Sequence, residues 1–264
     1  MEKLFKPRKI WAVGDIHGCH TELMALMGKL EDAGLDCKKD TVVFMGDYID
    51  RGPDTKKVIE QLLDYHRRYE HWVFLYGNHE DIFYDFIVTQ GRRYGISIWF
   101  ANGGKTTWES YGGHFGKQDK PGGPVEMPKP PEFPKEHLDF LFKETHRLYE
   151  MDKDYVFIHA GLVPGASIEE SSHYPDTLLW AREGFIDSDW DWGKFVIFGH
   201  SAAYKSRWGE LGMPIMMKNK CGIDGAVCPP ANKNLLAIEL PEKKIHGIKA
   251  GSLEYFTLDY DIIK

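Results

Sequence analysis

The sequence is poor in cysteine and in long apolar runs. Its 264 residues include four cysteines, at positions 19, 37, 221 and 228, and no Cys-x-x-Cys pair. Four cysteines are too few for a disulfide framework, so we expect ordinary thiols in a reducing compartment; for Cys221 and Cys228 a zinc site or a redox pair is the alternative. No uncharged apolar stretch approaches the roughly 18 residues of a membrane-spanning helix, and the N-terminus lacks the apolar core of a signal peptide. These absences predict a cytoplasmic protein with no membrane partner.

The chain also lacks an excess of positive charge. Lys and Arg total 33 against 40 Asp and Glu, which gives a formal net charge of −7. This balance argues against binding to long nucleic acids. The hydrophobic content of 42% is that of an ordinary globular protein. The length suits one large α/β domain, which we expect to span residues 1–264; nothing in the sequence indicates an oligomeric state.

Five short runs rich in β-branched and aromatic residues are each followed by glycine and polar residues. They occupy residues 10–15, 42–47, 72–78, 155–161 and 195–200. Each run predicts a buried strand that ends in a loop. Apolar residues spaced i, i+3, i+4 predict helices around residues 23–30, 58–63 and 82–87. The alternation of strand and helix indicates the α/β class.

Two further regions have a different character. Three short segments, at residues 234–240, 244–248 and 255–258, are separated by turn residues, and we expect them to form an antiparallel meander that closes a second sheet. Residues 101–135 hold 7 of the 27 glycines and 6 of the 14 prolines. That content predicts an irregular surface excursion of the domain, with little regular structure.

Polar residues follow all five predicted strands, and all but the arginine among them can bind metal ions. They are Asp15 and His17, then Asp47, Asp50 and Arg51, then Asn78 and His79, then His159, and finally His200. Ligands of open α/β sheets bind at the carboxyl ends of the strands, so we expect these side chains to share one crevice. Each residue alone is also explained as a turn former, a helix cap or a core histidine. As a set, carboxylate, amide and imidazole donors suit two bridged Mn²⁺, Fe²⁺ or Zn²⁺ ions.

The same residues lie in five ordered motifs. These are Gly14-Asp-Ile-His-Gly18, Gly46-Asp-Tyr-Ile-Asp-Arg-Gly52, Gly77-Asn-His-Glu80, His159-Ala-Gly161 and Gly199-His200. The series resembles that of the calcineurin-like metallophosphoesterases, in particular the bacterial and bacteriophage type of the phosphoprotein phosphatase family. The resemblance covers residues 14–200. It implies a metallophosphoesterase β-sandwich flanked by helices, in α/β/β/α layers, with the site at the C-terminal ends of the strands.

The resemblance also implies a role for each residue. The metal ligands would be Asp15 and His17 for one ion, Asp47 as the bridge, and Asn78, His159 and His200 for the other. Two divalent ions, with Mn²⁺ preferred, would supply a bridging hydroxide that attacks phosphorus directly. His79 would protonate the leaving group, because a histidine beside a carboxylate such as Asp50 has its tautomer fixed. Arg51 and Arg182 would hold the phosphate oxygens; a solvated arginine is the alternative for Arg182.

Three functions stay open at this point. The preferred one is a serine/threonine or dual-specificity protein phosphatase, with a phosphoprotein or phosphopeptide as substrate. The second is a symmetrical bis(5'-nucleosyl)-tetraphosphatase or another small-molecule phosphoesterase, although such dinucleotide enzymes depart at the positions of Asp50 and Glu80. The third is a phosphate-binding scaffold without activity, which the complete ligand set disfavours. Residues 102–112 resemble a stretch of the same bacterial members and lack the spacing of a nucleotide-binding P-loop.

Overall fold

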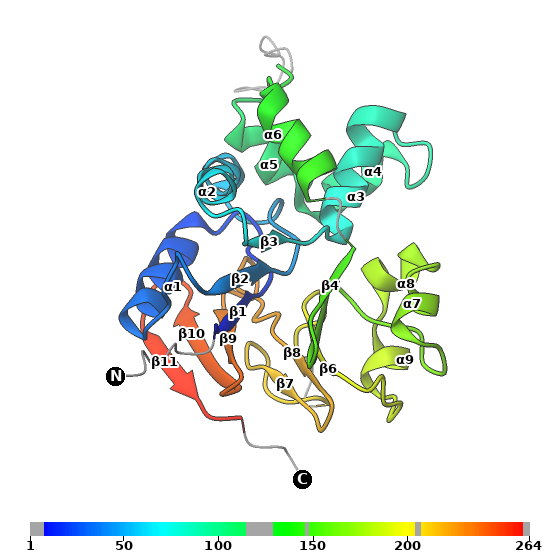
Figure 1. Ribbon diagram of the computed structural model, residues 1–264. Coiled ribbons are helices and arrows are strands. Elements are labelled where there is room, and N and C mark those ends of the chain that lie inside the picture. The colour runs from blue at the N-terminus through cyan, green and yellow to red at the C-terminus, as the bar shows by residue number, and fades with distance from the viewer. Residues whose placement is uncertain (1–7, 115–128, 146–147, 204–206, 261–264) are drawn as a thin grey trace.

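Two stacked β-sheets form the centre of the protein (Figure 1). The structure is a computed structural model, and it describes residues 8–114, 129–145, 148–203 and 207–260. The first sheet has the strand order β11-β10-β9-β1-β2-β3, and the second has the order β4-β5-β6-β8-β7. The strands are β1 (Ile10–Val13), β2 (Thr41–Phe44), β3 (Val73–Phe74), β4 (Tyr149–Met151), β5 (Tyr155–Ile158), β6 (Phe195–Phe198), β7 (Ile215–Met216), β8 (Lys220–Gly222), β9 (Asn234–Leu240), β10 (Lys244–Lys249) and β11 (Tyr255–Leu258).

Helices flank both sheets. Figure 1 shows α1 and α2 beside the first sheet, α7 to α9 beside the second, and α3 to α6 together at the top. The helices are α1 (His20–Asp32), α2 (Thr55–Arg68), α3 (Asn78–Tyr84), α4 (Ile96–Trp99), α5 (Lys105–Ser110), α6 (Lys135–Asp139), α7 (Ile168–Ser171), α8 (Pro175–Trp180) and α9 (Glu183–Ile186). Three π-helical segments continue α3, α4 and α6, namely η1 (Asp85–Thr89), η2 (Phe100–Gly104) and η3 (Phe140–Glu144).

The alternation of side chains along each strand creates the layers. Trp11 of β1 packs in the core beneath α1 and α2, whereas its neighbour Ala12 lies in the core between the sheets. In β5, Phe157 faces that middle core and Val156 packs beneath α8 and α9. Successive residues of a strand point to opposite faces, so each sheet is apolar on both sides and is covered twice. The predicted α/β/β/α arrangement is therefore confirmed.

The predicted helices and strands occur where the sequence pattern placed them. Leu23, Leu26, Met27 and Leu30 are the buried residues of α1. The second pattern forms α2, and the third forms α3 and η1. The five predicted strands correspond to β1, β2, β3, β5 and β6; of these, β3 is much shorter than its apolar run.

The C-terminal meander was assigned to the wrong sheet. Strands β9, β10 and β11 extend the first sheet, because β9 pairs antiparallel with β1. All seven residues of β9 are buried. Its alternate residues pack into the core beneath the helices and into the core between the sheets, while β1 and β10 pair with its two edges. The second sheet is instead built from β5, β6 and β8, which run parallel.

The glycine- and proline-rich window has more regular structure than its composition predicts. Residues 105–110 form α5, and residue 135 begins α6. Residues 115–128 of this window lie outside the described part of the chain. Helix α5 packs on α2, which provides the tertiary contacts that a helix of six residues needs.

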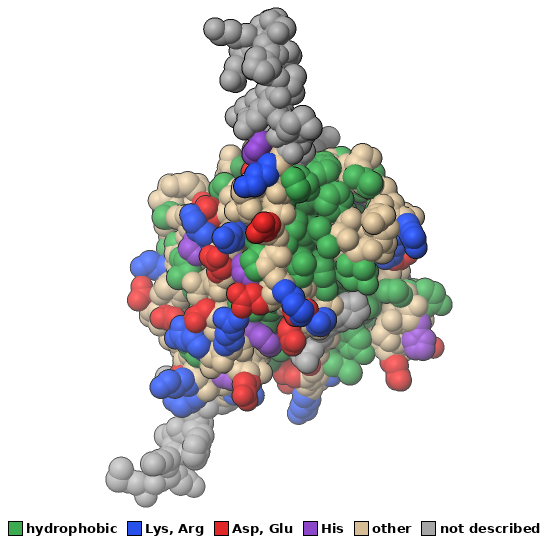
Figure 2. All heavy atoms as spheres, turned by 90° about the horizontal axis from the view of Figure 1, so that it is seen from above, with side chains coloured by type: hydrophobic (Ala, Val, Ile, Leu, Met, Phe, Trp, Pro, Cys, Tyr) green, Lys and Arg blue, Asp and Glu red, His purple; other side chains and the backbone are tan. Residues whose placement is uncertain are grey.

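The surface seen from above carries no uniform charge. In Figure 2, basic and acidic side chains are interspersed, and a band of hydrophobic side chains runs beside them. Tyr84, Val88, Ile96 and Ile98 are the exposed apolar residues of α3, η1 and α4. Among the described residues, no helix combines the length and the apolar character that a membrane crossing requires.

Candidate active site

The polar residues that follow the five strands converge at one place, although the strands belong to two sheets. Together with Arg182 they make ten candidate residues. Eight of the ten are buried, with His200 the most exposed of these eight at 7%. Five candidates have a left-handed backbone, with φ between 45° and 70°: His17, Asp47, Asp50, Arg51 and His200. Side chains other than glycine rarely adopt this conformation. Strain of this kind concentrates at functional sites, where the surrounding structure enforces it.

Asp47 lies at the centre of the site. It shares one group of metal-competent atoms with His17 and His79, and a second group with His159 and His200. Its Oδ2 is 3.5 Å from His17 Nε2, and its Oδ1 is 3.4 Å from His159 Nε2. One carboxylate therefore faces both groups with different oxygens, which is the geometry of a bridging ligand.

The second group contains more acceptors than donors. His159 Nδ1 lies 2.9 Å from the carbonyl oxygen of Met45, which can only accept, so Nδ1 carries the proton and Nε2 presents a lone pair. Burial lowers the pKa of His159 and keeps the ring neutral. Yet Nε2 lies 3.0 Å from Asn78 Oδ1, another acceptor. Two lone pairs at this distance favour a cation between them.

His200 extends the same mismatch. Its Nδ1 lies 2.9 Å from Asn78 Oδ1, and its buried Nε2 has no hydrogen-bond partner among the described atoms. Unpartnered buried nitrogens are rare in native proteins and call for an explanation. Oxygen and imidazole donors together suit a divalent transition ion. The residues present therefore fit the metal centre that the motifs predict.

The carboxylates add to this fit. Asp15 accepts the backbone N–H of His200 at 3.0 Å. Burial, and then the nearby Asp224 and Asp47, raise the pKa of Asp15 well above its usual range. Grouping buried carboxylates is unfavourable unless cations or hydrogen bonds compensate their charge. Divalent ions would provide that compensation.

His79, a member of the first group, forms a buried pair with Asp50. His79 Nδ1 lies 2.8 Å from Asp50 Oδ2, and both side chains are fully buried. Because the carboxylate accepts, Nδ1 carries the proton. His79 Nε2 then accepts from Arg51 Nη2 at 2.9 Å, and Arg51 Nη1 donates to His17 Nε2 at 2.8 Å. The arginine fork therefore joins His17 and His79, two members of the first group.

Arg182 lies at the edge of the site. Its guanidinium is 3.4 Å from the carbonyl oxygen of His200 and 3.3 Å from Ser201 Oγ. The side chain is exposed. It remains accessible to a bound anion, whereas most of its candidate partners are buried.

Several residues around the site were not predicted from the sequence. Asp224 follows β8, so the rule that found the other carboxylates would have found it had β8 been recognised as a parallel strand. Glu80 accepts backbone N–H groups from Asp47, Tyr48 and Gly77 at 2.9, 2.9 and 3.0 Å, and so joins the loops after two strands. No local signal marked these contacts, because they connect residues up to 33 positions apart.

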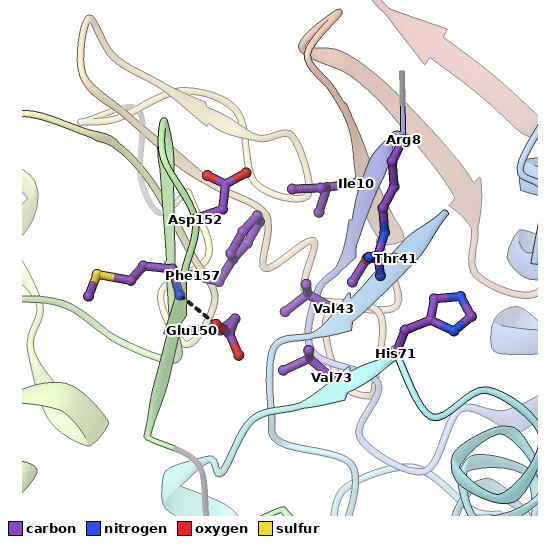
Figure 3. A pocket seen from close by; sticks show the side chains of 10 residues that line it. Arg8, Ile10, Thr41, Val43, His71, Val73, Glu150, Asp152 and Phe157 are labelled. Carbon is purple, nitrogen blue, oxygen red and sulfur yellow. Dashed lines mark hydrogen bonds between the residues drawn. The ribbon is translucent and has the colours of Figure 1, made fainter. Parts of the chain in front are cut away.

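A separate cavity of about 380 Å³ opens between the sheets (Figure 3). Its lining includes Ile10 and Thr41, the first residues of β1 and β2, together with Val43 and Phe157. The candidate residues instead follow the last residues of these strands. This cavity therefore lies at the other end of the sheets and contains none of the ten candidates.

Comparisons with known proteins agree with this geometry. The family model described as calcineurin-like phosphoesterase matches residues 8–204. Serine/threonine-protein phosphatase 1 of Salmonella typhimurium is 36% identical over 98 residues, which are 37% of this chain and 39% of that protein. Serine/threonine-protein phosphatase 2 of the same organism is 26% identical over 185 residues, 69% of this chain and 71% of that one.

Relatives with a different name are also found. A symmetrical bis(5'-nucleosyl)-tetraphosphatase of Nitrosospira multiformis is 26% identical over 162 residues, 61% of this chain and 46% of its own length. Among solved structures, one provisionally assigned as a diadenosine tetraphosphatase superposes with a TM-score of 0.62 and 15% identity, and covers 95% of this chain and 96% of that one. The matched residues 8–204 include all ten candidates. The chain belongs to the calcineurin-like phosphoesterase family, whose members are metal-dependent hydrolases.

Proposed function

We propose that this hydrolase is a two-metal phosphomonoesterase that acts on phosphoserine or phosphothreonine in proteins or peptides. The observation that carries the proposal is the buried His79–Asp50 pair, 2.8 Å apart, beside Arg51 and the two ligand groups. The proposed ligands are Asp15, His17, Asp47, Asn78, His159 and His200. When bound, two divalent ions, of which we favour Mn²⁺ over Fe²⁺ or Zn²⁺, would lower the pKa of water and neutralise the charge of the phosphate.

The remaining residues handle the substrate and the proton. Arg51 presents a planar fork at the centre of the site, and Arg182 presents a second one at its edge; such forks suit the oxygens of a phosphate dianion. His79 keeps Nδ1–H on Asp50, so Nε2 is the nitrogen that can deliver a proton to the leaving oxygen. To deliver it, the ring must carry a second proton on Nε2 while Nδ1–H stays on Asp50.

The His79–Asp50 pair also bears on the substrate class. The alkoxide of serine is a much poorer leaving group than a nucleotide phosphate, so an acid that protonates it accelerates the reaction more. The two Salmonella relatives are named for serine/threonine phosphatase activity. A symmetrical dinucleoside tetraphosphatase is the second candidate, because a relative of that name matches 61% of the chain. The free cysteines support the cytoplasmic location that we propose with this activity.

The experiment compares two substrates on protein loaded with Mn²⁺. We expect kcat/KM for a phosphoserine peptide to exceed that for diadenosine tetraphosphate. In His79→Asn, peptide turnover should fall by roughly 10²- to 10⁴-fold while both ions stay bound. Preference for the dinucleotide would establish the second candidate instead. Absence of turnover, even with p-nitrophenyl phosphate and two bound ions, would indicate a scaffold without activity.

A further inference from the structure

The turn that carries Asp50 and Arg51 is held by a segment more than fifty residues away. Asp50 N–H donates to Thr107 Oγ1 at 2.9 Å, and that hydroxyl donates to Asp50 Oδ1 at 2.7 Å. Arg51 N–H donates to the carbonyl oxygen of Gly103 at 3.1 Å. Both turn residues have a left-handed backbone, with φ of 70° and 65°. These bonds therefore stabilise a conformation that the turn alone would not favour.

Trp99 completes the contacts of the Asp50 carboxylate. Its indole N–H donates to Asp50 Oδ1 at 3.0 Å, and both residues are fully buried. The indole is fixed by aromatic neighbours, with ring centroids 4.9 Å from Phe83 and 4.4 Å from Phe86. Within the described ranges, Oδ1 thus receives two neutral donors, and Oδ2 receives His79 Nδ1 alone.

Two glycines allow this approach. Gly103 has φ of +101°, and a Cβ at this position would lie 2.9 Å from the backbone nitrogen of Arg51. A Cβ at Gly104 would lie 2.4 Å from Cε2 of Trp99. Any side chain at either position would push the segment away from the turn or the indole away from Asp50. The segment that contains Gly103, Gly104 and Thr107 thus packs against the Asp50–Arg51 turn and does not form a P-loop.

We propose that Thr107 and Trp99 are positioning residues for proton delivery to the leaving group, an inference that rests on the acid role proposed for His79. By occupying Oδ1 they direct Oδ2 of Asp50 toward Nδ1 of His79. The ring is then held with Nε2 facing the reacting group. Loss of either donor frees the carboxylate to rotate, so that the imidazole is no longer held in a single orientation.

The step that depends on this orientation is the departure of the leaving group. The oxygen of a water molecule, which loses a proton to solvent, bonds to phosphorus. The bond from phosphorus to the leaving oxygen breaks, and its electron pair goes to that oxygen. The oxygen takes the proton from Nε2 of His79, whose N–H electron pair stays on nitrogen, and solvent later restores the proton. Leaving groups that are already stable as anions need this proton least.

The test is a series of phosphate monoesters with leaving groups from alkyl alcohols to 2,4-dinitrophenol, on Mn²⁺-loaded protein. In Thr107→Val, kcat for alkyl phosphates should fall by roughly tenfold or more, and kcat for 2,4-dinitrophenyl phosphate by less than about twofold. Trp99→Phe should likewise lower kcat more for alkyl phosphates than for 2,4-dinitrophenyl phosphate, which steepens the slope of kcat against leaving-group stability. Thr107→Ser, which keeps the hydroxyl, should show the same slope as the wild type. A merely structural role would lower kcat equally across the series.

Two further variants make the result unambiguous. In Thr106→Val the same hydroxyl is lost one residue away, where it donates to the Gly103 carbonyl and not to Asp50; its slope should match that of the wild type. His79→Asn gives the slope of kcat against leaving-group stability when the proposed acid, His79, is absent. If His79→Asn is no steeper than the wild type, the acid role itself fails. If His79→Asn is steep but Thr107→Val and Trp99→Phe are not, only the positioning role is overturned.

Discussion

Two polar clusters lie against the first sheet, one of them shared with the second sheet, and only that one has the features of a reaction centre. The first is the set of proposed metal ligands, here named the catalytic cluster: Asp15, His17, Asp47, Asn78, His159 and His200. The second is the outer cluster, defined as Glu239 of β9, His246 of β10, Tyr255 of β11 and Lys9, which precedes β1. His246 is only 1% exposed, about as little as the catalytic histidines. Burial of a histidine therefore does not distinguish the clusters.

The match between donors and acceptors does distinguish them. In the outer cluster, His246 Nε2 lies 3.0 Å from Glu239 Oε2, its Nδ1 lies 2.7 Å from the Tyr255 hydroxyl, and Glu239 also accepts from Lys9. In the catalytic cluster, lone pairs of His159 and Asn78 face each other and His200 Nε2 has no partner among the described atoms. A satisfied network specifies structure, whereas a cluster of facing lone pairs is suited to binding a cation.

The largest expected effect comes from exchanging one carboxylate in each cluster for its amide. Asp47→Asn removes the charge that both ligand groups share, so we expect Mn²⁺ affinity and kcat to fall by at least about a hundredfold. Glu239→Gln, the matched change in the outer cluster, should alter both by less than about twofold. Calorimetric Mn²⁺ titration and steady-state kinetics measure the two quantities. Full metal binding by Asp47→Asn would contradict the assignment of the catalytic cluster.

Metal binding should stabilise the protein through the catalytic cluster alone. At an Mn²⁺ concentration one hundred times the dissociation constant, the free energy of unfolding should rise by about 2.7 kcal/mol per ion relative to chelator. The same rise is expected in Glu239→Gln, although that variant starts from a lower stability. Asp47→Asn should lose most of it. Urea unfolding with Mn²⁺ or EDTA measures the difference, and an equal rise in Asp47→Asn would show that the ions bind elsewhere.

The catalytic cluster was predicted from the sequence more accurately than the strand arrangement around it. Every ligand candidate lies within four residues of the end of an apolar run, so a local pattern marks it, and the structure brings these candidates together. Strand β9 was recognised as a strand but assigned to the wrong sheet, because apolar character predicts burial and does not identify the neighbouring strand. The roles of the individual residues remain predictions.

Contacts over long separations were beyond the sequence pattern. Thr107 and Asp50 are 57 residues apart, and Thr107 lies in a window whose glycines predicted irregular structure. The outer cluster was missed for the same reason. His246 and Glu239 lie on adjacent antiparallel strands, and their pairing depends on the register of β9 and β10. A pattern of single residues contains no information about which acceptor a buried histidine will meet.

The smallest predicted effect concerns the pH dependence of the outer cluster. Burial lowers the pKa of His246, and Glu239 opposes this shift only in part. Near the ordinary histidine pKa of about 6.5, the unfolded chain then takes up a proton that the folded protein refuses, so the contribution of His246 to stability is present above that pH and is lost as the pH falls.

The comparison of wild type with His246→Gln isolates this contribution, because the catalytic histidines titrate in both proteins. In EDTA at pH 8, the free energy of unfolding of the variant should be lower by about 1–3 kcal/mol, the cost of unpaired buried groups. The difference should shrink between pH 7 and pH 5. Urea unfolding across this range gives the sign directly. A difference that grows toward pH 5 would mean that His246 gains a proton in the folded protein, and therefore that its attraction to Glu239 outweighs the effect of burial.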